Sequence, residues 1–293
     1  MTFAKVYQWH KWQLLFGRDA KVDFACRGLK MARELAGVNA KMEIDPKGVS
    51  ICSHRTSRVV PIRFVLAELC YILAGRGDVA SIASYNKSMA HYSDDGTTIG
   101  GSYGLRLKYQ LPMLIQRLKD DVYTRQACAT IYDEMDCLDV TKTHQPCNVF
   151  MQFLCRPPFL DLHVTSRSSD FVTGFSIDTL HWQALLIMMA NELSFPHQAV
   201  LPTELHYDIG SLHIYEADIA MVEAWKPVLD RSYEHFLPLS ITLSAAIENC
   251  KKFFKEGLSL RQLAAILDIH HDAVLKLEEL DELFRQYKNV LVR

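Results

Sequence analysis

The sequence lacks the segments that would direct a chain into or across a membrane. Its N-terminal stretch, MTFAKVYQWHKWQLLF, contains no uninterrupted apolar run, so we expect no secretory signal. The longest apolar run, residues 184–190, is too short to cross a bilayer. Internal repeats and low-complexity segments are also missing, which argues against repeat architectures. We therefore expect no membrane partner.

Cysteine patterning of the metal-binding or disulfide kind is also missing. The eight cysteines form no CxxC pair and show no regular spacing, so the sequence predicts neither a disulfide framework nor a zinc site. His270 and His271 are adjacent and would point to different faces of a helix. Reduced thiols of this kind favour a cytoplasmic protein.

The chain also lacks an excess of charge of one sign. It has 32 Lys and Arg residues against 34 Asp and Glu residues, a formal net charge of −2. This balance leaves no general electrostatic footprint for DNA or RNA. What is present is an ordinary globular composition, 49% hydrophobic and 23% charged, with enough apolar material for one large core or a core plus a small appendage.

Hydrophobic spacing predicts mainly helices in the first part of the chain. Residues 22–35 have helical spacing, and Gly37 follows where a C-terminal cap belongs. Residues 59–74 predict a mostly buried helix, and residues 111–118 an amphipathic one. Between them, residues 75–104 are rich in Gly, Ser, Asp and Asn and predict a long functional loop.

The pattern changes to strands between about residues 127 and 175. Strands are predicted at 129–132, 148–155 and 160–166, then a helix at 179–193, a strand running into a helix at 211–225, and an all-helical tail from about residue 241. This order predicts an α/β (α+β) protein with a mixed β-sheet and flanking helices. We divide it into a catalytic domain, residues 1–235, and a helical C-terminal extension, residues 236–293.

The segment HQPCNVFMQF places Cys147 after a proline at the start of a predicted strand. A thiolate held there by rigid backbone and exposed to substrate could act as a nucleophile. The alternative is a buried structural cysteine, which is the commoner role of a single thiol.

Residues 166–178, SRSSDFVTGFSID, place Arg167, Ser168, Asp170 and Asp178 around a glycine-containing turn. Such a group suits the binding of a phosphate and a polar ring. A solvated loop with a surface ion pair would give the same pattern.

In the segment GSLHIY, His213 and Tyr215 alternate on a predicted strand and therefore face the same side. They could bind a ligand together, or they could form a hydrogen-bonded pair in the core. Each of these three patterns is weak alone, so their order along the chain carries more information.

Seven short motifs follow one another along the chain: AELCYIL, SYG, YTRQ, QPCN, RSSD, GFSID and HIY. In this order and with these intervals they resemble the thymidylate synthase superfamily, over roughly residues 60–220. The resemblance implies a thymidylate synthase-like mixed sheet with flanking helices. It also implies a homodimer whose active sites are shared between the subunits.

The resemblance also implies a role for each matching residue. Cys147 is the nucleophile that adds to C6 of a pyrimidine nucleoside monophosphate, and Glu68 is the general acid/base that organises water near the ring. Arg167 and Ser168 bind the phosphate, with Arg125 contributed by the partner subunit. The remaining substrate-binding residues are His213 and Tyr215 at the sugar hydroxyl, Asp170 and Gly174 in the pocket, and Tyr103 beside the nucleophile.

Asp178 departs from the thymidylate synthases, which have Asn at this position. An Asn amide can accept from uracil N3–H and donate to O4, whereas a carboxylate accepts from the C4 amino group of cytosine. A carboxylate facing uracil O4 would place two acceptors in contact. It could also stabilise a proton on N3, which would make the ring a better electron sink. Phage deoxycytidylate hydroxymethylases carry Asp here, so we assign Asp178 a catalytic role and predict a cytidylate substrate.

Other departures leave parts of the site open. Asn148 stands where thymidylate synthases have His, and we assign it to the substrate site; Gln126 replaces the second phosphate arginine. The sequence ends without the short apolar tail that closes over the folate, and we expect the better access of water to favour a hydroxymethyl product over a methyl product. The N-terminal phosphate-binding arginine has four candidates: Arg27, Arg33, Arg55 and Arg58.

The sequence thus predicts a transferase that converts dCMP to 5-hydroxymethyl-dCMP, and the resemblance implies 5,10-methylenetetrahydrofolate as its cofactor. Left open are a cytidylate methylase, a CMP hydroxymethylase, a dUMP-acting enzyme and a binding protein without turnover. The last needs no nucleophile, so Cys147 argues against it. Modified cytosine suits a phage that protects its DNA, whose enzyme would act in the host cytoplasm, or a nucleoside-antibiotic pathway.

The tail superficially resembles a helix-turn-helix. A DNA reader would carry basic and amide residues at the start of its second helix, near Asp272, but here acidic residues follow at 278–282. We therefore expect a helical hairpin that packs on the core or on the dimer, without direct DNA binding. Its apolar face is formed by Leu260, Leu263, Ile266 and Leu267.

Overall fold

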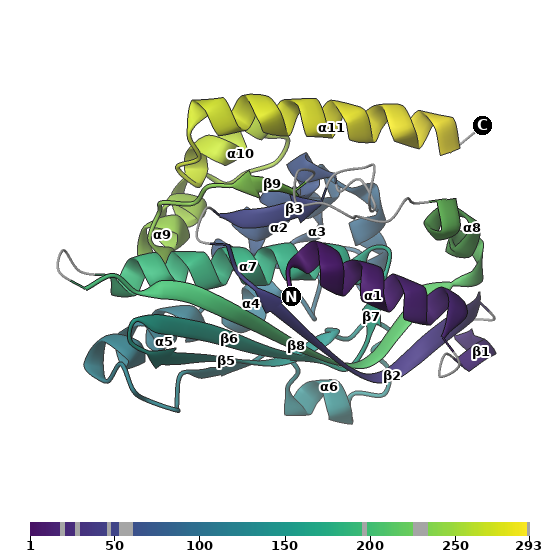
Figure 1. Ribbon diagram of the computed structural model, residues 1–293, viewed down its shortest axis with the longest axis horizontal. Helices are drawn as coiled ribbons and strands as arrows, with labels where there is room; N and C mark the ends of the chain where they lie inside the picture. The colour runs from purple at the N-terminus through teal and green to yellow at the C-terminus, as the bar shows by residue number, and fades with distance from the viewer. Residues whose placement is uncertain are drawn as a thin grey trace.

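A seven-stranded mixed sheet lies at the centre of the protein in the computed structural model (Figure 1). The structure describes residues 1–17, 21–26, 30–45, 48–52, 61–194, 198–224 and 234–291. The strands of the sheet are β1 (Lys21–Cys26), β2 (Lys30–Glu43), β4 (Cys128–Thr130), β5 (Asn148–Arg156), β6 (Phe159–Ser166), β7 (Ser169–Asp170) and β8 (Leu201–Tyr215). Their order is β1-β2-β8-β6-β5-β4, and β7 pairs with β8 beside this path.

Two pairs of neighbouring strands are parallel, β6 with β8 and β7 with β8. The other pairs, including β2 with β8, are antiparallel. Parallel neighbours need a crossover connection, and helix α7 (Gly174–Leu193) supplies it. A separate two-stranded sheet pairs β3 (Val49–Cys52) with β9 (Glu234–Leu237). The predicted mixed sheet with flanking helices is therefore confirmed.

Helix α7 is the centre of the hydrophobic core. Almost every side chain along it is buried, and a helix that is apolar on all sides must be covered on all sides. It contacts β6 and β8 on one side, and α2 (Ile62–Leu73) and α9 (Leu243–Phe253) on the other (Figure 1). This placement fixes the N-terminal part of α7, whose fifth residue is Asp178, between the sheet and α2.

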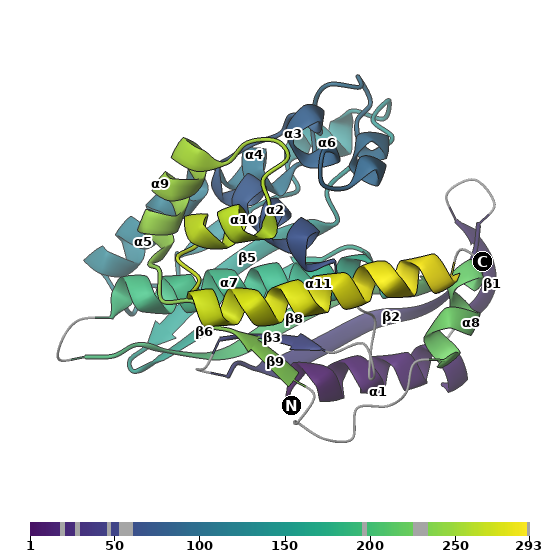
Figure 2. The ribbon, with the colours of Figure 1, turned by 90° about the horizontal axis from the view of Figure 1, so that it is seen from above.

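The remaining helices surround this core. They are α1 (Phe3–Phe16), α3 (Val79–Ala83), the 3-10 helix η1 (Lys87–Tyr92), α4 (Tyr103–Leu107), α5 (Gln110–Asp120), α6 (Glu134–Leu138), α8 (Glu216–Ala224), α10 (Leu260–Ile266) and α11 (His271–Leu291). Figure 2 shows α5, α9 and α10 at one end of the molecule, with α8 and β1 at the other. Within the described ranges, no helix is both long and apolar enough to span a bilayer.

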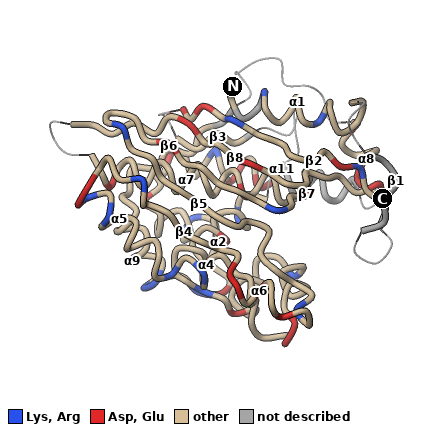
Figure 3. Tube along the Cα trace, turned by 90° about the horizontal axis from the view of Figure 1, so that it is seen from below, with Lys and Arg blue, Asp and Glu red and all other residues tan. Residues whose placement is uncertain are grey.

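The sheet has one face turned to the core and one that carries polar side chains. Along β8, Leu205, Tyr207 and Ile209 are buried, whereas Glu204 and His206 are only half-buried because successive side chains alternate between faces. Residues directly opposite each other on neighbouring strands share a face. We call the polar side the open face; it includes Lys41, Asp161, His163, Glu204 and His206. Figure 3, seen from below, shows acidic and basic positions interspersed along the chain.

The helix predicted at residues 22–35 is wrong. Residues 21–26 form β1 and residues 30–43 form β2. Gly37 has the positive φ of 67° expected of a helix cap, but it lies inside β2. The long pairing of β2 with β8 supplies backbone hydrogen bonds over most of its length, and this tertiary pairing outweighs the local helical spacing.

Most other predicted elements are confirmed. The buried helix at 59–74 is α2, the helix at 111–118 is α5, and the helix at 179–193 is the greater part of α7. The three predicted strands correspond to β4, β5 and β6, and the strand-to-helix segment to β8 and α8. Residues 75–104 do form an irregular region, but it contains α3 and η1.

The C-terminal helices pack on the core, as the hairpin interpretation predicts. Leu260 and Leu263 of α10 are buried, and α10 and α11 both contact α2. Arg261 of α10 forms an ion pair with Glu278 of α11, with Nε 2.7 Å from Oε1. The acidic run therefore serves in part to join the two helices. The division into domains at residue 236 stays a prediction.

Candidate active site

Cys147 lies at the end of the loop that leads into β5, and its side chain is half-buried. Its carbonyl accepts hydrogen bonds from the backbone N–H of Arg167 at 2.9 Å and from Ser166 Oγ at 3.0 Å. On the other side the loop touches Gly101, where an added Cβ would lie 2.9 Å from Pro146 Cδ. The thiol is therefore carried by backbone that is held on two sides, as a reacting nucleophile requires.

The guanidinium of Arg167 lies along the same loop. Nε donates to the carbonyl of Pro146 at 3.0 Å, and Nη2 donates to the carbonyl of Gln145 at 3.0 Å. A permanent positive charge thereby lies against the backbone of the two residues that precede Cys147. The side chain is otherwise exposed, so the guanidinium can also meet an anion from solvent.

Asp178 is held by two hydrogen-bond donors that sequence reasoning did not link to it. Asn148 Nδ2 donates to Asp178 Oδ2 at 2.9 Å. The hydroxyl of Tyr207 lies 3.2 Å from the same oxygen and 2.9 Å from Asn148 Oδ1; its single hydrogen can serve one acceptor at a time. Within the described residues, both hydrogen bonds of the carboxyl group use Oδ2, which leaves Oδ1 for a ligand.

The environment of Asp178 favours its neutral form more than water does. Burial raises the pKa from 3.8 to about 6, although the hydrogen bonds from Asn148 and Tyr207 pull it in the opposite direction. The group therefore titrates close to neutral pH, where it can change from a pure acceptor to a donor. Perturbed carboxyls of this kind concentrate at functional sites.

Glu68 is the second carboxyl of the site, and its side chain is half-buried. Loss of hydration and, to a smaller extent, the negative charge of Asp178 together raise its pKa from 4.5 to about 8. His181 Nε2 lies 3.9 Å from Glu68 Oε2 and 3.1 Å from the carbonyl of Val65. Burial lowers the pKa of His181 to about 4, so the imidazole is neutral and donates to that carbonyl. At neutral pH Glu68 is therefore a protonated acid beside a neutral imidazole.

We expect Glu68→Gln to stabilise the protein at alkaline pH while it impairs turnover. The folded-state pKa lies above the unfolded one, so the contribution of Glu68 to stability is full below about pH 4.5 and is lost as the pH rises through about 8. Gln does not titrate. The free energy of unfolding of the variant, relative to wild type, should therefore rise by roughly 4 kcal/mol between about pH 5 and pH 9 in denaturant titrations.

Glu192→Gln is the matched control, because Glu192 is a buried carboxyl with the opposite shift. Burial raises its pKa, but the hydrogen bonds from Lys119 and Ser244 outweigh that effect and lower it overall. The ionised Glu192 therefore stabilises the wild-type protein above the unfolded pKa. Relative to wild type, Glu192→Gln should become less stable as the pH rises through about 4.5. If Glu68→Gln also lost stability relative to wild type as the pH rises, Glu68 would not have the raised pKa on which its predicted stabilisation rests.

Tyr103 lies between α7 and the start of β5. Its ring stacks on Trp182 of α7, with centroids 6.0 Å apart. Burial raises the pKa of its hydroxyl well above 10, and the negative charges of Asp178 and Cys147 add to the effect. The backbone of Asn148 hydrogen-bonds to the same hydroxyl, and the role of Tyr103 beside a nucleophile stays a prediction.

The residues predicted to bind the sugar and the phosphate are connected through Ser168. Its Oγ lies 3.5 Å from His213 Nδ1 on β8, and the rings of His213 and Tyr215 meet edge-on with centroids 5.1 Å apart. Asp170 of β7 pairs with His213 in register, and its carboxylate accepts from the backbone N–H of Val172 at 2.8 Å. The three predicted motifs around Cys147, Ser168 and His213 therefore meet at one place.

Gly174 begins α7 next to this group. A Cβ at this position would lie 3.1 Å from Ser169 Oγ, so the turn is tight where the helix starts. Asp170 also accepts from the hydroxyl of Thr173 at 2.6 Å, which ties the turn to β7. Both residues thus shape the start of α7, and the direct contacts with substrate assigned to them stay predictions.

The predicted phosphate arginines outside this cluster have different positions. Arg125 lies before β4 with an exposed side chain, and its carbonyl accepts from Gln152 Nε2 at 2.7 Å. Arg33 on β2 donates through Nη1 to the carbonyl of Leu15 at 3.0 Å, which anchors it to α1. The other three N-terminal candidates, Arg27, Arg55 and Arg58, lie outside the described residues.

Comparison with known proteins gives a consistent result. The thymidylate synthase family model matches residues 30–272. Deoxyuridylate hydroxymethyltransferase of Bacillus phage SP01 is 34% identical over 53% of this chain and 44% of its own length. The protein of the same name from Pseudomonas phage M6 is 34% identical over 42% of this chain and 37% of its own length. Thymidylate synthase of Streptococcus pyogenes is 25% identical over 55% of this chain and 59% of its own length.

These relatives are matched only in part, since each alignment leaves out two fifths or more of the relative's length. Among solved structures, the thymidylate synthase of phage T4 superimposes with a TM-score of 0.60 and 18% identity, covering 77% of this chain and 81% of the other. At that identity the likeness concerns the fold alone.

Proposed function

Because the chain belongs to the thymidylate synthase family, we propose that it transfers a one-carbon unit to C5 of a pyrimidine nucleotide and converts dCMP to 5-hydroxymethyl-dCMP. The observation that carries the choice of base is the Asp178 carboxyl, whose Oδ2 is engaged by Asn148 and Tyr207 and whose Oδ1 is left for the ring. The nucleophile that carries the choice of reaction is Cys147.

In the first step the Cys147 thiolate forms a bond to C6. The electron pair of the 5,6 double bond moves toward C5 and the ring carbonyl, so C5 becomes nucleophilic. Arg167 supports the thiolate through its charge, and the loop held by Ser166 keeps the sulfur in place. After the new bond at C5 has formed, loss of the C5 proton and expulsion of the thiolate restore the double bond.

Cytosine is the base that an ionised Asp178 suits. Oδ1 would accept a hydrogen bond from the C4 amino group, whereas uracil would present O4, a second acceptor, at the same point. Glu68 is protonated at neutral pH and lies near the same end of α7, so it can pass a proton to the ring or to an ordered water. Together the two carboxyls supply one acceptor and one acid.

The phosphate and sugar would be held on the opposite side of the ring. Arg167 has a planar, permanently charged fork that suits phosphate oxygens, and Ser168 adds a hydroxyl beside it. His213, 3.5 Å from Ser168, and Tyr215 would bind the 3′ side of the sugar. Their contacts do not address a 2′-hydroxyl, so CMP remains an alternative substrate for the test.

The carbon donor we propose is 5,10-methylenetetrahydrofolate, which supplies a carbon at the oxidation level of formaldehyde. The residues present suit such a donor, because Cys147 creates a carbon nucleophile that needs an electrophilic carbon, and the neutral Glu68 can protonate a leaving amine. A hydroxymethyl product then requires only water, whereas a methyl product also requires a hydride. We propose the hydroxymethyl product.

A second candidate is hydroxymethylation of dUMP. Two phage relatives at 34% identity are named deoxyuridylate hydroxymethyltransferases, and a protonated Asp178 could donate to uracil O4. Tritium release from C5 of labelled dCMP, dUMP and CMP, each with methylenetetrahydrofolate, separates the substrates, and mass analysis identifies the product. Release from dCMP with a hydroxymethyl product is expected. Release from dUMP alone would overturn the assignment of the base, and no release from any nucleotide would overturn turnover itself.

We also propose a homodimer that forms through the open face of the sheet, with Arg125 reaching the partner's phosphate site. Arg125 is exposed and lies beside Gln152 of β5, close to the open face, which supports contact with a partner subunit. Arg125→Ala and Cys147→Ala should each be inactive alone. Mixed, they should recover about one quarter of the wild-type activity, because half of the dimers are mixed and each has one complete site. A mixture that stays inactive would place Arg125 in the site of its own subunit.

A further inference from the structure

Two matching tripeptides lie side by side on the open face, far from the cysteine. Residues 161–163 read Asp-Leu-His on β6, and residues 204–206 read Glu-Leu-His on β8. The strands are parallel, and the register pairs Asp161 with Glu204 and His163 with His206. Since side chains two residues apart share a face, two carboxylates and two imidazoles gather on the same surface.

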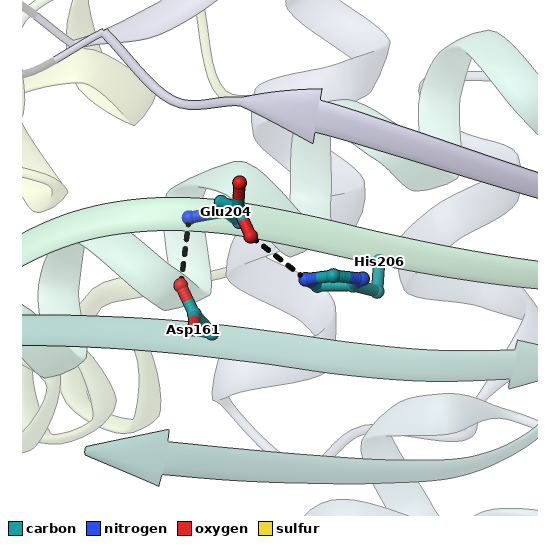
Figure 4. Close-up of side chains that lie close together, drawn as sticks. All are labelled: Asp161, Glu204 and His206. Atoms are coloured by element: carbon teal, nitrogen blue, oxygen red, sulfur yellow. Dashed lines mark hydrogen bonds and ion pairs between the residues drawn. The ribbon is translucent and has the colours of Figure 1, made fainter. Parts of the chain in front are cut away.

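The side chains converge in space as the register requires. Glu204 Oε2 lies 3.1 Å from His206 Nε2, and Asp161 Oδ1 accepts from the backbone N–H of Glu204 at 3.0 Å (Figure 4). One ligand atom from each of these three residues lies within 4.8 Å of the other two. The ring of His163 stacks on that of His206, with centroids 4.2 Å apart and planes at 3°.

We propose that these residues form a binding site for a divalent transition metal such as Zn²⁺. Asp161, Glu204 and His206 would be the ligands, and His163 could provide a fourth. Carboxylate oxygen and imidazole nitrogen together suit Zn²⁺, which binds such atoms at about 2.0–2.2 Å and prefers four ligands in a tetrahedron. The half-buried side chains need only small rotations about their χ angles to close on an ion of this size.

The imidazole pair is what distinguishes this group from an ordinary cluster of acidic residues. His163 stacks on His206, so the group offers imidazole nitrogen as well as carboxylate oxygen. This mixture of donors is typical of Zn²⁺ sites, whereas Ca²⁺ and Mg²⁺ prefer oxygen ligands.

Lys41 shows that the group attracts a cation. Its ammonium nitrogen lies 2.8 Å from Glu204 Oε2 and forms an ion pair with that carboxylate. Lys41 sits opposite His206 on β2 and therefore competes with a metal for the same oxygen. In the proposed homodimer a partner would cover this face, and two carboxylates against one ammonium would be costly to bury without a further positive charge.

The site is separate from the proposed catalytic centre. Asp161 precedes Ser166, whose hydroxyl touches the Cys147 carbonyl, by five residues along β6, which amounts to roughly 16 Å. A metal here would join β6 to β8, the parallel pair at the middle of the sheet, and would play no part in one-carbon transfer. The test is therefore independent of the reaction proposed above.

The experiment titrates the metal-free, full-length chain with Co²⁺ and then with Zn²⁺ in competition. Ligation by oxygen and nitrogen should give d–d absorption in the visible range without the sulfur-to-cobalt charge-transfer band that a cysteine site would add. Glu204→Gln and His206→Asn should each weaken binding at least tenfold. Lys41→Gln should strengthen it several-fold, because the competing ammonium is removed, and this gain cannot result from misfolding.

Cys147→Ser is the matched control and should leave the titration unchanged. A charge-transfer band that disappears in Cys147→Ser would show that the thiol binds the metal, and the proposal would fail. Equal affinity in wild type, Glu204→Gln and His206→Asn would overturn it as well. Since none of the proposed ligands belongs to the catalytic machinery, tritium release by the metal-free protein separates this outcome from failure of the proposed reaction.

Discussion

Cys147→Ser should lower turnover by about 10⁴-fold or more while the affinity for nucleotide changes by only a few-fold. A serine hydroxyl is far less acidic than a cysteine thiol and is a weak nucleophile without activation, so the substituted side chain should not add to C6 at a useful rate. The phosphate and sugar residues do not depend on the sulfur, so binding should persist. Tritium release from C5 measures turnover, and equilibrium binding of dCMP measures affinity.

Two other cysteines provide the controls. Cys137 is exposed and Cys128 is half-buried, so both are accessible thiols that the proposed mechanism does not use. Cys137→Ser and Cys128→Ser should retain wild-type turnover. With a 5-fluoropyrimidine nucleotide and methylenetetrahydrofolate, mass spectrometry should find the trapped adduct on the peptide that contains Cys147. An adduct on either of the other two thiols, or normal turnover in Cys147→Ser, would refute covalent catalysis by this residue.

The parts of the site that could be predicted from the sequence are those carried by short motifs. Cys147 and Arg167 come together because a hairpin joins the ends of β5 and β6, so residues that flank the two strands must meet. Ser168 and His213 meet because β7 adds in register to β8. Both contacts follow from the order of the strands and the alternation of side chains along them, which can be inferred from the sequence.

The parts that could not be predicted depend on contacts between distant segments. Tyr207 reaches Asn148 across 59 residues, and His181 reaches the carbonyl of Val65 across 116. Tyr207 did carry one signal, since it lies on the same strand as His213. That Tyr207 meets Asn148 of β5 and Asp178 of α7 is determined by tertiary packing, which the local pattern does not reveal. The strands at residues 21–43 were missed for the same reason, because the pairing with β8 is a tertiary interaction.

Asp178→Asn should move the preference of the enzyme from dCMP toward dUMP. Asn148 Nδ2 donates toward the position of Asp178 Oδ2, so the amide oxygen of an introduced Asn would occupy that position. The NH₂ group would then replace Oδ1 and face the base. A pure acceptor becomes a pure donor at the point where cytosine presents its amino group and uracil presents O4.

The size of the effect follows from two hydrogen bonds that change sign. For dCMP an attractive contact becomes a donor facing a donor, and for dUMP the reverse occurs. At about 1.4 kcal/mol for each, the ratio of the two kcat/KM values should change by roughly a hundredfold. Asp170→Asn is the matched control. The Asp170 carboxylate accepts from the backbone of Val172 in the turn between β7 and α7, so the ratio should stay near that of wild type.

The pH dependence provides a second readout of the same contact. Burial raises the pKa of Asp178 to about 6, and the two donors on Oδ2 leave Oδ1 as the atom that takes up the proton. In wild type the preference for dCMP should therefore weaken as the pH falls through about 6, because a protonated Oδ1 can donate to uracil O4. In Asp178→Asn the ratio should not follow this titration. A variant that keeps the wild-type preference at every pH would show that base choice lies elsewhere in the site.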